Sequence, residues 1–224
     1  MKRITLFAGH YGSGKTNIAV NYAKFIKSEG FDVSIIDLDI VNPYFRTKDN
    51  EEDLKKCGIE LVSSEYANTN LDAPALPKEI YARIADKSKK LVIDVGGDDR
   101  GAVALGRFAP DITDENDFEM LFVANFYRPL TQIAEDALQV MREIELAGHI
   151  RFTGIVHNSN IGDETTAFDI TKKEKELKKL AELSKLPVVF TAVSENVYPE
   201  FQNSNSELFK LELQKKYYKI EKEI

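Results

Sequence analysis

The sequence predicts one α/β domain in which helices cover both faces of a mostly parallel sheet. Short apolar segments alternate with amphipathic ones along the 224 residues. Strands that alternate with helices favour parallel pairing, because each helix carries the chain back across the sheet. No internal repeat and no linker-like stretch divides the chain, and a hydrophobic fraction of 43% is enough for a proper core. We therefore expect a single domain over residues 1–224.

A phosphate-binding motif follows the first expected strand, residues 2–8. It matches the pattern G-x-x-x-x-G-K-[ST] without a mismatch, and its residues are Gly9, His10, Tyr11, Gly12, Ser13, Gly14, Lys15 and Thr16. From Thr16 onward, apolar residues recur at helical spacing, so the motif lies between a strand and a helix N-terminus. Glycines let successive backbone N–H groups point at one phosphate chain, and the helix dipole adds to their field. A structural glycine turn is the alternative, but strand, motif and helix together favour nucleotide binding.

The side chains of this motif have separate expected roles. Lys15 is expected to bridge the outer phosphates as a catalytic residue, and Thr16 to ligate Mg²⁺. The remaining residues of the motif, together with the adjoining Asn17, are candidate nucleotide contacts.

A second strand is expected over residues 32–37, and it ends in an Asp-x-Asp sequence. Alternate residues of an extended chain face the same way, so Asp37 and Asp39 can point toward one ligand region. We expect both to lie near the metal ion and Asp39 to orient the attacking water. The alternative is that they begin an Asx turn before Asn42 and Pro43.

The next segments lead to a third acidic position. We expect a short helix over 49–57, a strand over 59–62, a long loop over 63–77 and an amphipathic helix over 78–88. A loop of that length is usually functional or mobile. The apolar strand 91–95 then ends near Asp94, which we expect to act as the Walker B carboxylate beside the metal, with capping of a turn as the alternative. Gly97 suits backbone that must approach the γ-phosphate.

The second half of the chain continues the alternation of strands and helices. Strands are expected over 120–125, 152–156 and 187–193. Helices are expected over 101–109, 131–147 and 164–185, with an acidic loop over 110–117 and a last helix over 206–224 that packs on the domain. Thr131 is a plausible N-cap for the helix over 131–147 and Gly148 its stop.

On these motifs the chain resembles the MinD/ParA/CobQ/CooC-like P-loop ATPases of the SIMIBI class. The resemblance rests on Gly9–Thr16 and on the segments 35–39, 91–97 and 156–158. It implies a three-layer P-loop NTPase fold with about seven or eight mostly parallel strands. It also implies ATP and Mg²⁺ as cofactors, an ATP-dependent homodimer, a protein client, and slow hydrolysis used as a switch.

Two features depart from that group. Its members usually carry a second lysine in the phosphate loop that reaches across the dimer, and His10 occupies the matching position. A neutral imidazole cannot replace an ammonium at pH 7, so Arg46 or Arg100 is a candidate substitute. Because Cys57 is the single cysteine, the branch that shares a metal cluster through two cysteines per subunit is excluded.

The resemblance also places Asn158 where relatives contact adenine. A guanine site would take the pattern Asn-Lys-x-Asp, and the segment 160–163 lacks its lysine, which favours ATP over GTP. Turn chemistry is the competing explanation for Asn158 and Asn160.

Composition limits the remaining possibilities. A formal charge of −7 argues against a general nucleic-acid-binding surface, and the lysine-rich segment 171–185 suits a solvated helix face. The lone cysteine fits a reducing cytosol, and the chain offers neither room for a signal peptide nor an apolar run near the ~20 residues that span a bilayer. We expect a cytoplasmic protein, with membrane docking disfavoured by the glutamates of the C-terminal segment.

Three functions fit these motifs. The leading one is an ATP-driven switch for a protein partner. A phosphotransferase or ligase of the dethiobiotin synthetase or CobB type is the second, although residues 100–117 contain only Arg100 and Arg107 and so lack an arginine-rich lid. The third is a nucleotide-sensing scaffold without useful turnover.

Overall fold

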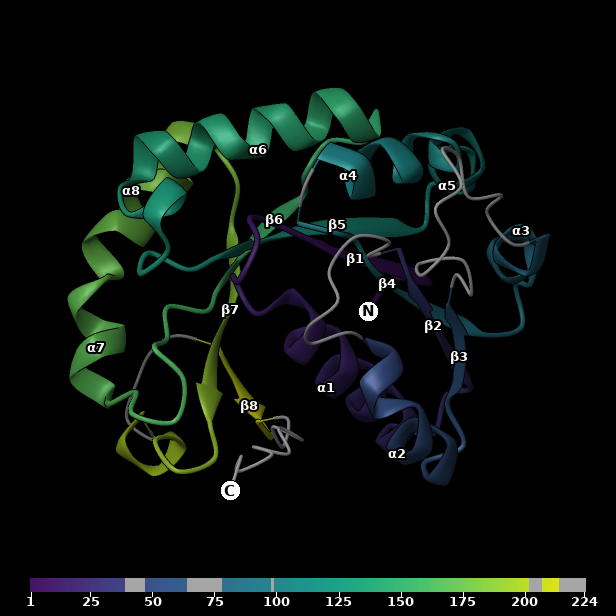
Figure 1. Ribbon diagram of the computed structural model, residues 1–224, viewed down its shortest axis with the longest axis horizontal. Coiled ribbons are helices and arrows are strands. Elements are labelled where there is room, and N and C mark those ends of the chain that lie inside the picture. Colours follow the sequence, from purple (N-terminus) through teal and green to yellow (C-terminus); the bar gives the residue numbers. More distant parts are fainter. Residues whose placement is uncertain (39–46, 64–77, 98, 202–206, 214–224) are drawn as a thin grey trace, which may run out of the picture.

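The computed structural model describes residues 1–38, 47–63, 78–97, 99–201 and 207–213. Its centre is an eight-stranded sheet in the order β3-β2-β4-β1-β5-β6-β7-β8 (Figure 1). Every neighbouring pair is parallel, so the carboxyl ends of the strands lie on one edge of the sheet. The strands are β1 Ile4–Ala8, β2 Val33–Asp37, β3 Glu60–Ser63, β4 Lys90–Asp94, β5 Phe118–Ala124, β6 Gly154–His157, β7 Val188–Ser194 and β8 Leu208–Leu211.

Helices cover both faces of this sheet. They are α1 Lys15–Ser28, α2 Glu51–Lys56, α3 Lys78–Ala85, α4 Asp99–Gly106, α5 Ala109–Glu115, α6 Ala134–Gly148, α7 Ala167–Lys172 and α8 Glu174–Ser184, with short 3₁₀ turns at Thr47–Asn50, Pro129–Thr131 and Tyr198–Phe201. Figure 1 shows α1 and α2 on one face and α4, α5 and α6 on the other. The expected three-layer α/β architecture is therefore confirmed.

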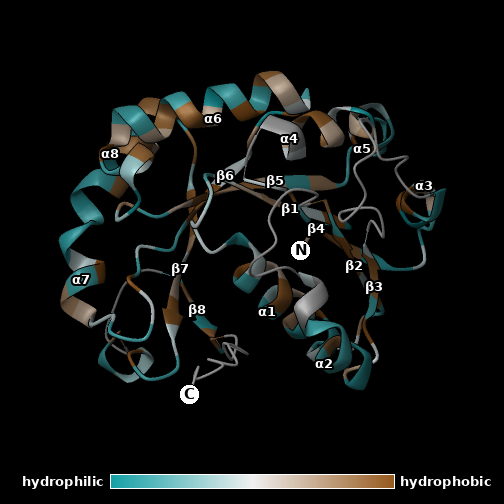
Figure 2. Cartoon of the chain, in the orientation of Figure 1, coloured by the Kyte–Doolittle hydropathy of each residue, from teal (hydrophilic) through white to brown (hydrophobic). Residues whose placement is uncertain are grey.

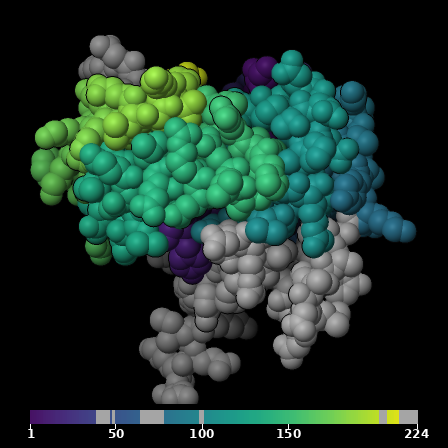
Figure 3. Space-filling model, turned by 90° about the horizontal axis from the view of Figure 1, so that it is seen from above, coloured from purple at the N-terminus to yellow at the C-terminus, as the bar shows by residue number. Residues whose placement is uncertain are grey.

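The core has two main parts because strand side chains alternate between the faces. In β1, Ile4, Leu6 and Ala8 pack with apolar residues of α3–α6 and α8, whereas Phe7 packs with α1 and α2. Figure 2 shows the hydrophobic segments concentrated on the strands and inner helix faces. The outer surface of the α6 layer is seen in Figure 3, where green α6 lies between the lighter green of α8 and the teal segment that precedes β5.

Two segments differ from the sequence prediction in the α3–α8 layer. Residues 110–117, expected as an acidic loop, mostly form helix α5, because Pro110 suits a helix start and Ile112 buries fully against the core. Residues 164–185, expected as one helix, form α7 and α8, which meet at Lys173. A capping box at Thr166 begins α7.

The expected ends of α6 also need correction. Thr131 is not its N-cap, because the residue in that position is Ile133 in extended conformation. The Thr131 hydroxyl instead donates to the carbonyl of Asn125 at 2.7 Å. At the other end Gly148 is the last helical residue, and His149 caps the helix in the left-handed conformation with a φ of 54°.

The expected C-terminal helix over 206–224 is wrong where the structure describes it. Residues Leu208–Leu211 form strand β8, which pairs in parallel with β7. Phe209 packs among Phe25, Tyr22 and Phe190, with ring centroids 5.0 to 5.9 Å apart. The contacts with these aromatic rings favour a strand here, although apolar residues of the sequence recur at helical spacing. Residues 214–224 lie outside the described part. No helix of the described residues is long and apolar enough to cross a membrane.

Candidate nucleotide site at the carboxyl edge of the sheet

The phosphate-binding motif forms the turn between β1 and α1. Gly12 and Gly14 adopt left-handed backbone conformations, with φ of 73° and 90°, which residues with a Cβ rarely accept. Gly9 is required for space, since a Cβ there would lie 2.7 Å from the carbonyl oxygen of Val123. The loop is therefore shaped by its glycines and opens directly into α1, whose N-cap is Gly14.

The remaining motif residues are placed as a phosphate loop requires. Lys15 is buried, and its ammonium donates to the carbonyl oxygen of His10 at 3.3 Å, so it folds back over the loop. Tyr11 is 52% exposed at the tip, and Asn17 lies in the first turn of α1. The Ser13 hydroxyl is buried without a hydrogen-bond partner among the described residues, which fits a loop built to receive a polar ligand.

Gly97 lies directly against this loop. A Cβ built on it would lie 2.7 Å from the Lys15 Nζ and 2.8 Å from the backbone nitrogen of Tyr11. The segment after β4 therefore passes so close to the phosphate loop that a side chain at this position would displace the lysine.

The carboxyl ends of β2 and β4 bring two acidic side chains to the same place. The Thr16 hydroxyl donates to Asp94 Oδ2 at 2.6 Å, and the Thr47 hydroxyl donates to the same oxygen at 3.0 Å. Asp37 stands opposite Asp94 in the strand register, and both are buried. The structure thus brings together three of the four residues expected at the metal, namely Thr16, Asp37 and Asp94.

This donor set fits Mg²⁺ in a phosphate-loop site. The described residues contain no group of three or more His, Cys, Asp or Glu side chains arranged to hold a metal ion. Mg²⁺ does not need one, since it is usually held by one or two carboxylates together with substrate phosphates and water. The Thr16 hydroxyl and the carboxylates of Asp94 and Asp37 are the groups that would hold it.

Three residues singled out in the sequence remain untested. Asp39, expected to orient water, and Arg46, a candidate substitute for the second lysine, lie outside the described residues. The side chain of Arg100 does so too. Most of the long loop 63–77 falls in the same category.

Asn158 holds the phosphate loop through a hydrogen bond to its backbone. Its amide Nδ2 donates to the Ser13 carbonyl at 2.7 Å, and a Cβ on Gly14 would lie 2.3 Å from that nitrogen. The Asn158 carbonyl in turn accepts from the amide of Asn160, whose own oxygen accepts from the Gly162 backbone N–H as in an Asx turn. Adenine contact by Asn158 stays a prediction, and turn chemistry accounts for Asn160.

His10 lies beside the loop in an environment that keeps it neutral. Its Nδ1 is 2.9 Å from the Tyr11 carbonyl. Partial burial lowers the pKa of His10 below 6.5, and the positive charges of Lys15 and Arg128 lower it further, against the opposing effect of the Tyr11 carbonyl. Without a ligand, His10 therefore carries no lysine-like charge at neutral pH.

Arg128 is a site residue that the sequence prediction missed. Its Nε donates to the Gly12 carbonyl at 2.7 Å, and its Nε and Cζ lie 3.5 and 3.9 Å from the position of a Cβ on Gly12. The available signal was a basic residue just after β5, the strand that neighbours β1 in the sheet.

Known structures share this fold. No protein-family model matches the sequence, and a search of curated proteins finds no match. Among solved structures, the cell division protein FtsY of Thermotoga maritima aligns with a TM-score of 0.62 at 19% identity, over 85% of this chain and 61% of that one. FtsY of Mycoplasma mycoides aligns with a TM-score of 0.60 at 20% identity, over 86% and 60%.

The signal recognition particle receptor FtsY of Elizabethkingia anophelis, in complex with GDP, gives a TM-score of 0.57 at 16% identity, over 86% of this chain and 57% of that one. This chain thus spans about three fifths of the length of these proteins. At such identities the likeness concerns the fold alone. The shared fold is the α/β fold with a parallel sheet flanked by helices.

Proposed function

We propose that the protein binds a nucleoside triphosphate with Mg²⁺ at Gly9–Thr16 and hydrolyses it slowly, as a nucleotide-driven switch for a protein partner. The observation that carries this proposal is the 2.6 Å hydrogen bond between Thr16 and Asp94, which joins the phosphate loop to an acidic strand end. A loop that merely turned the chain would not need a buried carboxylate at that position. In this site the hydroxyl and carboxylate are instead expected to share a metal ion.

The residues of the site have complementary roles in this proposal. Lys15 and the loop N–H groups bind the outer phosphates, and Gly97 leaves room for them beside the lysine. Bound Mg²⁺ supplies positive charge that neutralises the charge developing on the phosphates. Asp39 orients the attacking water, and Asp37 assists Asp94 in holding the metal shell.

We propose ATP as the preferred nucleotide, because the segment 160–163 lacks the lysine of a guanine-binding pattern. The E. anophelis FtsY structure is a complex with GDP, so GTP is the necessary comparison. Dimerisation with ATP and release of a protein client after hydrolysis complete the proposed cycle, as in the group that the sequence resembles.

The test is phosphate release from ATP and from GTP, with and without Mg²⁺. We expect slow, Mg²⁺-dependent release that favours ATP. Thr16→Ala should abolish release. Thr171→Ala should not change it, because the exposed Thr171 hydroxyl donates, within the described part of the chain, to carbonyls of helix α7 alone. Absence of Mg²⁺-dependent release from both nucleotides would refute the proposed turnover and direct attention to a reaction that needs an acceptor.

A further inference from the structure

We propose that Arg128 is a second fixed cation of the phosphate loop, which contacts the terminal phosphates of the bound nucleotide within its own subunit. The inference rests on the proposed function, since it concerns the same nucleotide. It differs from the expectation drawn from the resemblance, in which the second cation reaches the site from a partner subunit.

The geometry places the guanidinium on the loop. Arg128 Nε donates to the Gly12 carbonyl at 2.7 Å, which uses one of the five N–H donors of an arginine. The other four, on Nη1 and Nη2, form the planar fork that binds phosphate oxygens. Among the described residues, Gly12 provides the hydrogen-bond acceptor for the Arg128 side chain, and no carboxylate is close enough to form an ion pair with the guanidinium.

The same cation acts on another residue of the loop. Partial burial lowers the pKa of the His10 imidazole, and the charges of Lys15 and Arg128 lower it further. Because an interaction of this kind decays with distance, both cations lie close to His10. Because His10 is neutral, Lys15 and Arg128 are the positive charges that the described residues place beside the phosphate loop.

The backbone that carries Arg128 is held from within. Asn125 is fully buried, and its carbonyl accepts from the Arg128 backbone N–H at 3.2 Å and from the Thr131 hydroxyl at 2.7 Å. The Asn125 side-chain oxygen accepts from the Tyr127 backbone N–H at 3.0 Å. These bonds fix the turn before any ligand binds, which lowers the cost of ordering a catalytic cation.

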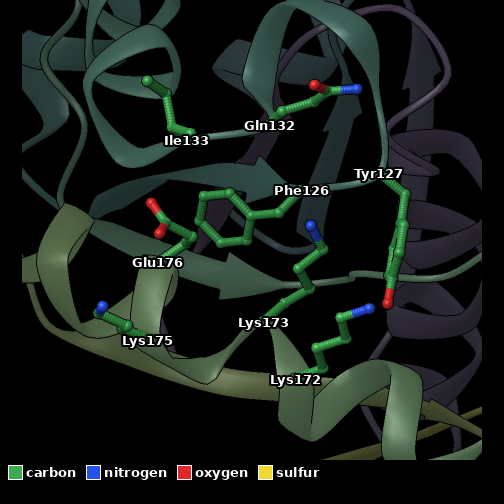
Figure 4. Close-up of a pocket in the computed structure, with 8 residues that line it drawn as sticks. All are labelled: Phe126, Tyr127, Gln132, Ile133, Lys172, Lys173, Lys175 and Glu176. Atoms are coloured by element: carbon green, nitrogen blue, oxygen red, sulfur yellow. The ribbon is translucent and has the colours of Figure 1, made fainter.

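The outer side of this turn is anchored to α7 and α8. The Tyr127 hydroxyl donates to the Asp169 carbonyl at 2.9 Å, and the Lys173 ammonium lies 4.6 Å from the centre of the Tyr127 ring. Figure 4 shows the Lys173 side chain between Phe126 and Tyr127, and all three residues line a cavity of about 430 Å³. Two adjacent residues of one turn thus contact different elements: Tyr127 contacts α7, and Arg128 contacts the phosphate loop.

Such a cation has a defined task in hydrolysis. A bond forms between the water oxygen and the γ-phosphorus, and the bond to the bridging oxygen breaks, with its electron pair staying on the diphosphate. Both water protons leave with the released dihydrogen phosphate. Negative charge grows on the bridging and equatorial oxygens. Arg128 stabilises that charge through the N–H donors of its planar guanidinium, which contact the phosphate oxygens.

If the cation comes from the same subunit as the phosphate loop, the rate of hydrolysis should not depend on association of subunits. The rate per subunit should stay constant when the protein concentration is varied across the range in which subunits associate. Arg128→Ala should lower kcat on the order of 10²-fold and leave the affinity for nucleoside diphosphate within a few-fold. Arg128→Lys should recover part of the rate, and Arg142→Ala, at an exposed arginine of α6 paired with Glu145, should behave as wild type.

A second measurement does not depend on turnover. Nucleoside diphosphate with Mg²⁺ and aluminium fluoride mimics the transferred phosphoryl group, and native mass spectrometry reports both its capture and the oligomeric state. We expect capture by single wild-type subunits as well as by dimers, and loss of capture in Arg128→Ala. Tyr127→Phe, which removes one anchor of the turn but keeps the arginine, should weaken capture less.

The possible results separate this inference from the proposed function. Equal kcat and equal capture in wild type and Arg128→Ala would overturn it, as would capture only by dimers or a rate that rises with protein concentration. If Arg128→Ala loses diphosphate affinity or thermal stability as much as it loses rate, Arg128 is only a support of the loop and the inference is wrong. If wild type hydrolyses neither nucleotide, the proposed turnover fails, and the capture experiment alone decides the role of Arg128.

Discussion

Replacement of His157 should remove a large part of the acid sensitivity of this protein. His157 ends β6 with its side chain buried, and neither ring nitrogen has a hydrogen-bond partner among the described residues. Burial lowers the pKa of His157 from 6.5 to about 4. The unfolded chain therefore binds a proton more readily than the folded protein between these two values.

The sign and size of the effect follow from that difference. The contribution to stability is complete above about pH 6.5 and is lost as the pH falls toward 4, since the proton favours the unfolded state. Between about pH 7.5 and about pH 4.5 the two pKa values correspond to a loss of about 2.5 kcal/mol in the free energy of unfolding.

The assay is urea unfolding of wild type and His157→Phe at both pH values. The phenylalanine cannot be protonated, so the loss between the two pH values should be smaller in the variant by about 2.5 kcal/mol, whatever the variant's stability at neutral pH. His149→Asn serves as the matched control, because His149 is exposed and asparagine tolerates its left-handed conformation. Equal pH dependence in wild type and His157→Phe would refute the reasoning.

Three further substitutions test the packing around the site. Gly97→Ala should weaken triphosphate binding on the order of 10-fold or more, because the new Cβ meets the Lys15 ammonium. Titration calorimetry measures the affinity, and an affinity equal to that of wild type would contradict the close approach of Gly97 to Lys15. Asn158→Ala should cost about 1–3 kcal/mol of stability through the buried Ser13 carbonyl, measured by urea unfolding. Leu211→Ala should cost about 2–4 kcal/mol in the same assay if β8 completes the core, and no loss would argue against that strand.

The parts of the fold that the sequence predicted are those with strong local signals. The strands at β1, β2 and β4 are short apolar runs buried on both faces, and the loop at Gly9–Thr16 has a fixed pattern of glycines. The parallel sheet follows from the alternation of these strands with helices. Its eighth strand was missed because the segment around Phe209 repeats at helical spacing, while its aromatic partners lie nearly 200 residues earlier or on β7.

The residues of the candidate site likewise differ in how strongly the local sequence indicates them. Thr16 was found from the phosphate-loop pattern and Asp94 from its place at the end of an apolar strand. The pairing of β1 with β4 then brings the two side chains within hydrogen-bond distance. Arg128 was missed because nothing in its own neighbourhood indicates a ligand. Its contact with Gly12 joins residues 116 positions apart and depends on β5 lying next to β1. Sequence neighbours cannot specify such a contact, whereas strand order can.

Strand order also explains why the phosphate loop is held without its ligand. The loop follows β1, and the segments after β5 and β6, the next two strands in the sheet, each send one side chain to a loop carbonyl: Arg128 to Gly12 and Asn158 to Ser13. Because the Ser13 carbonyl points toward Asn158, the Gly14 N–H on the other side of the same peptide can face the phosphates. The Ser13 N–H instead closes the turn by donating to the His10 carbonyl at 3.1 Å. The polar residues after β5 and β6 thus fix the backbone of the phosphate loop, and the acidic ends of β2 and β4 complete the site from the other side.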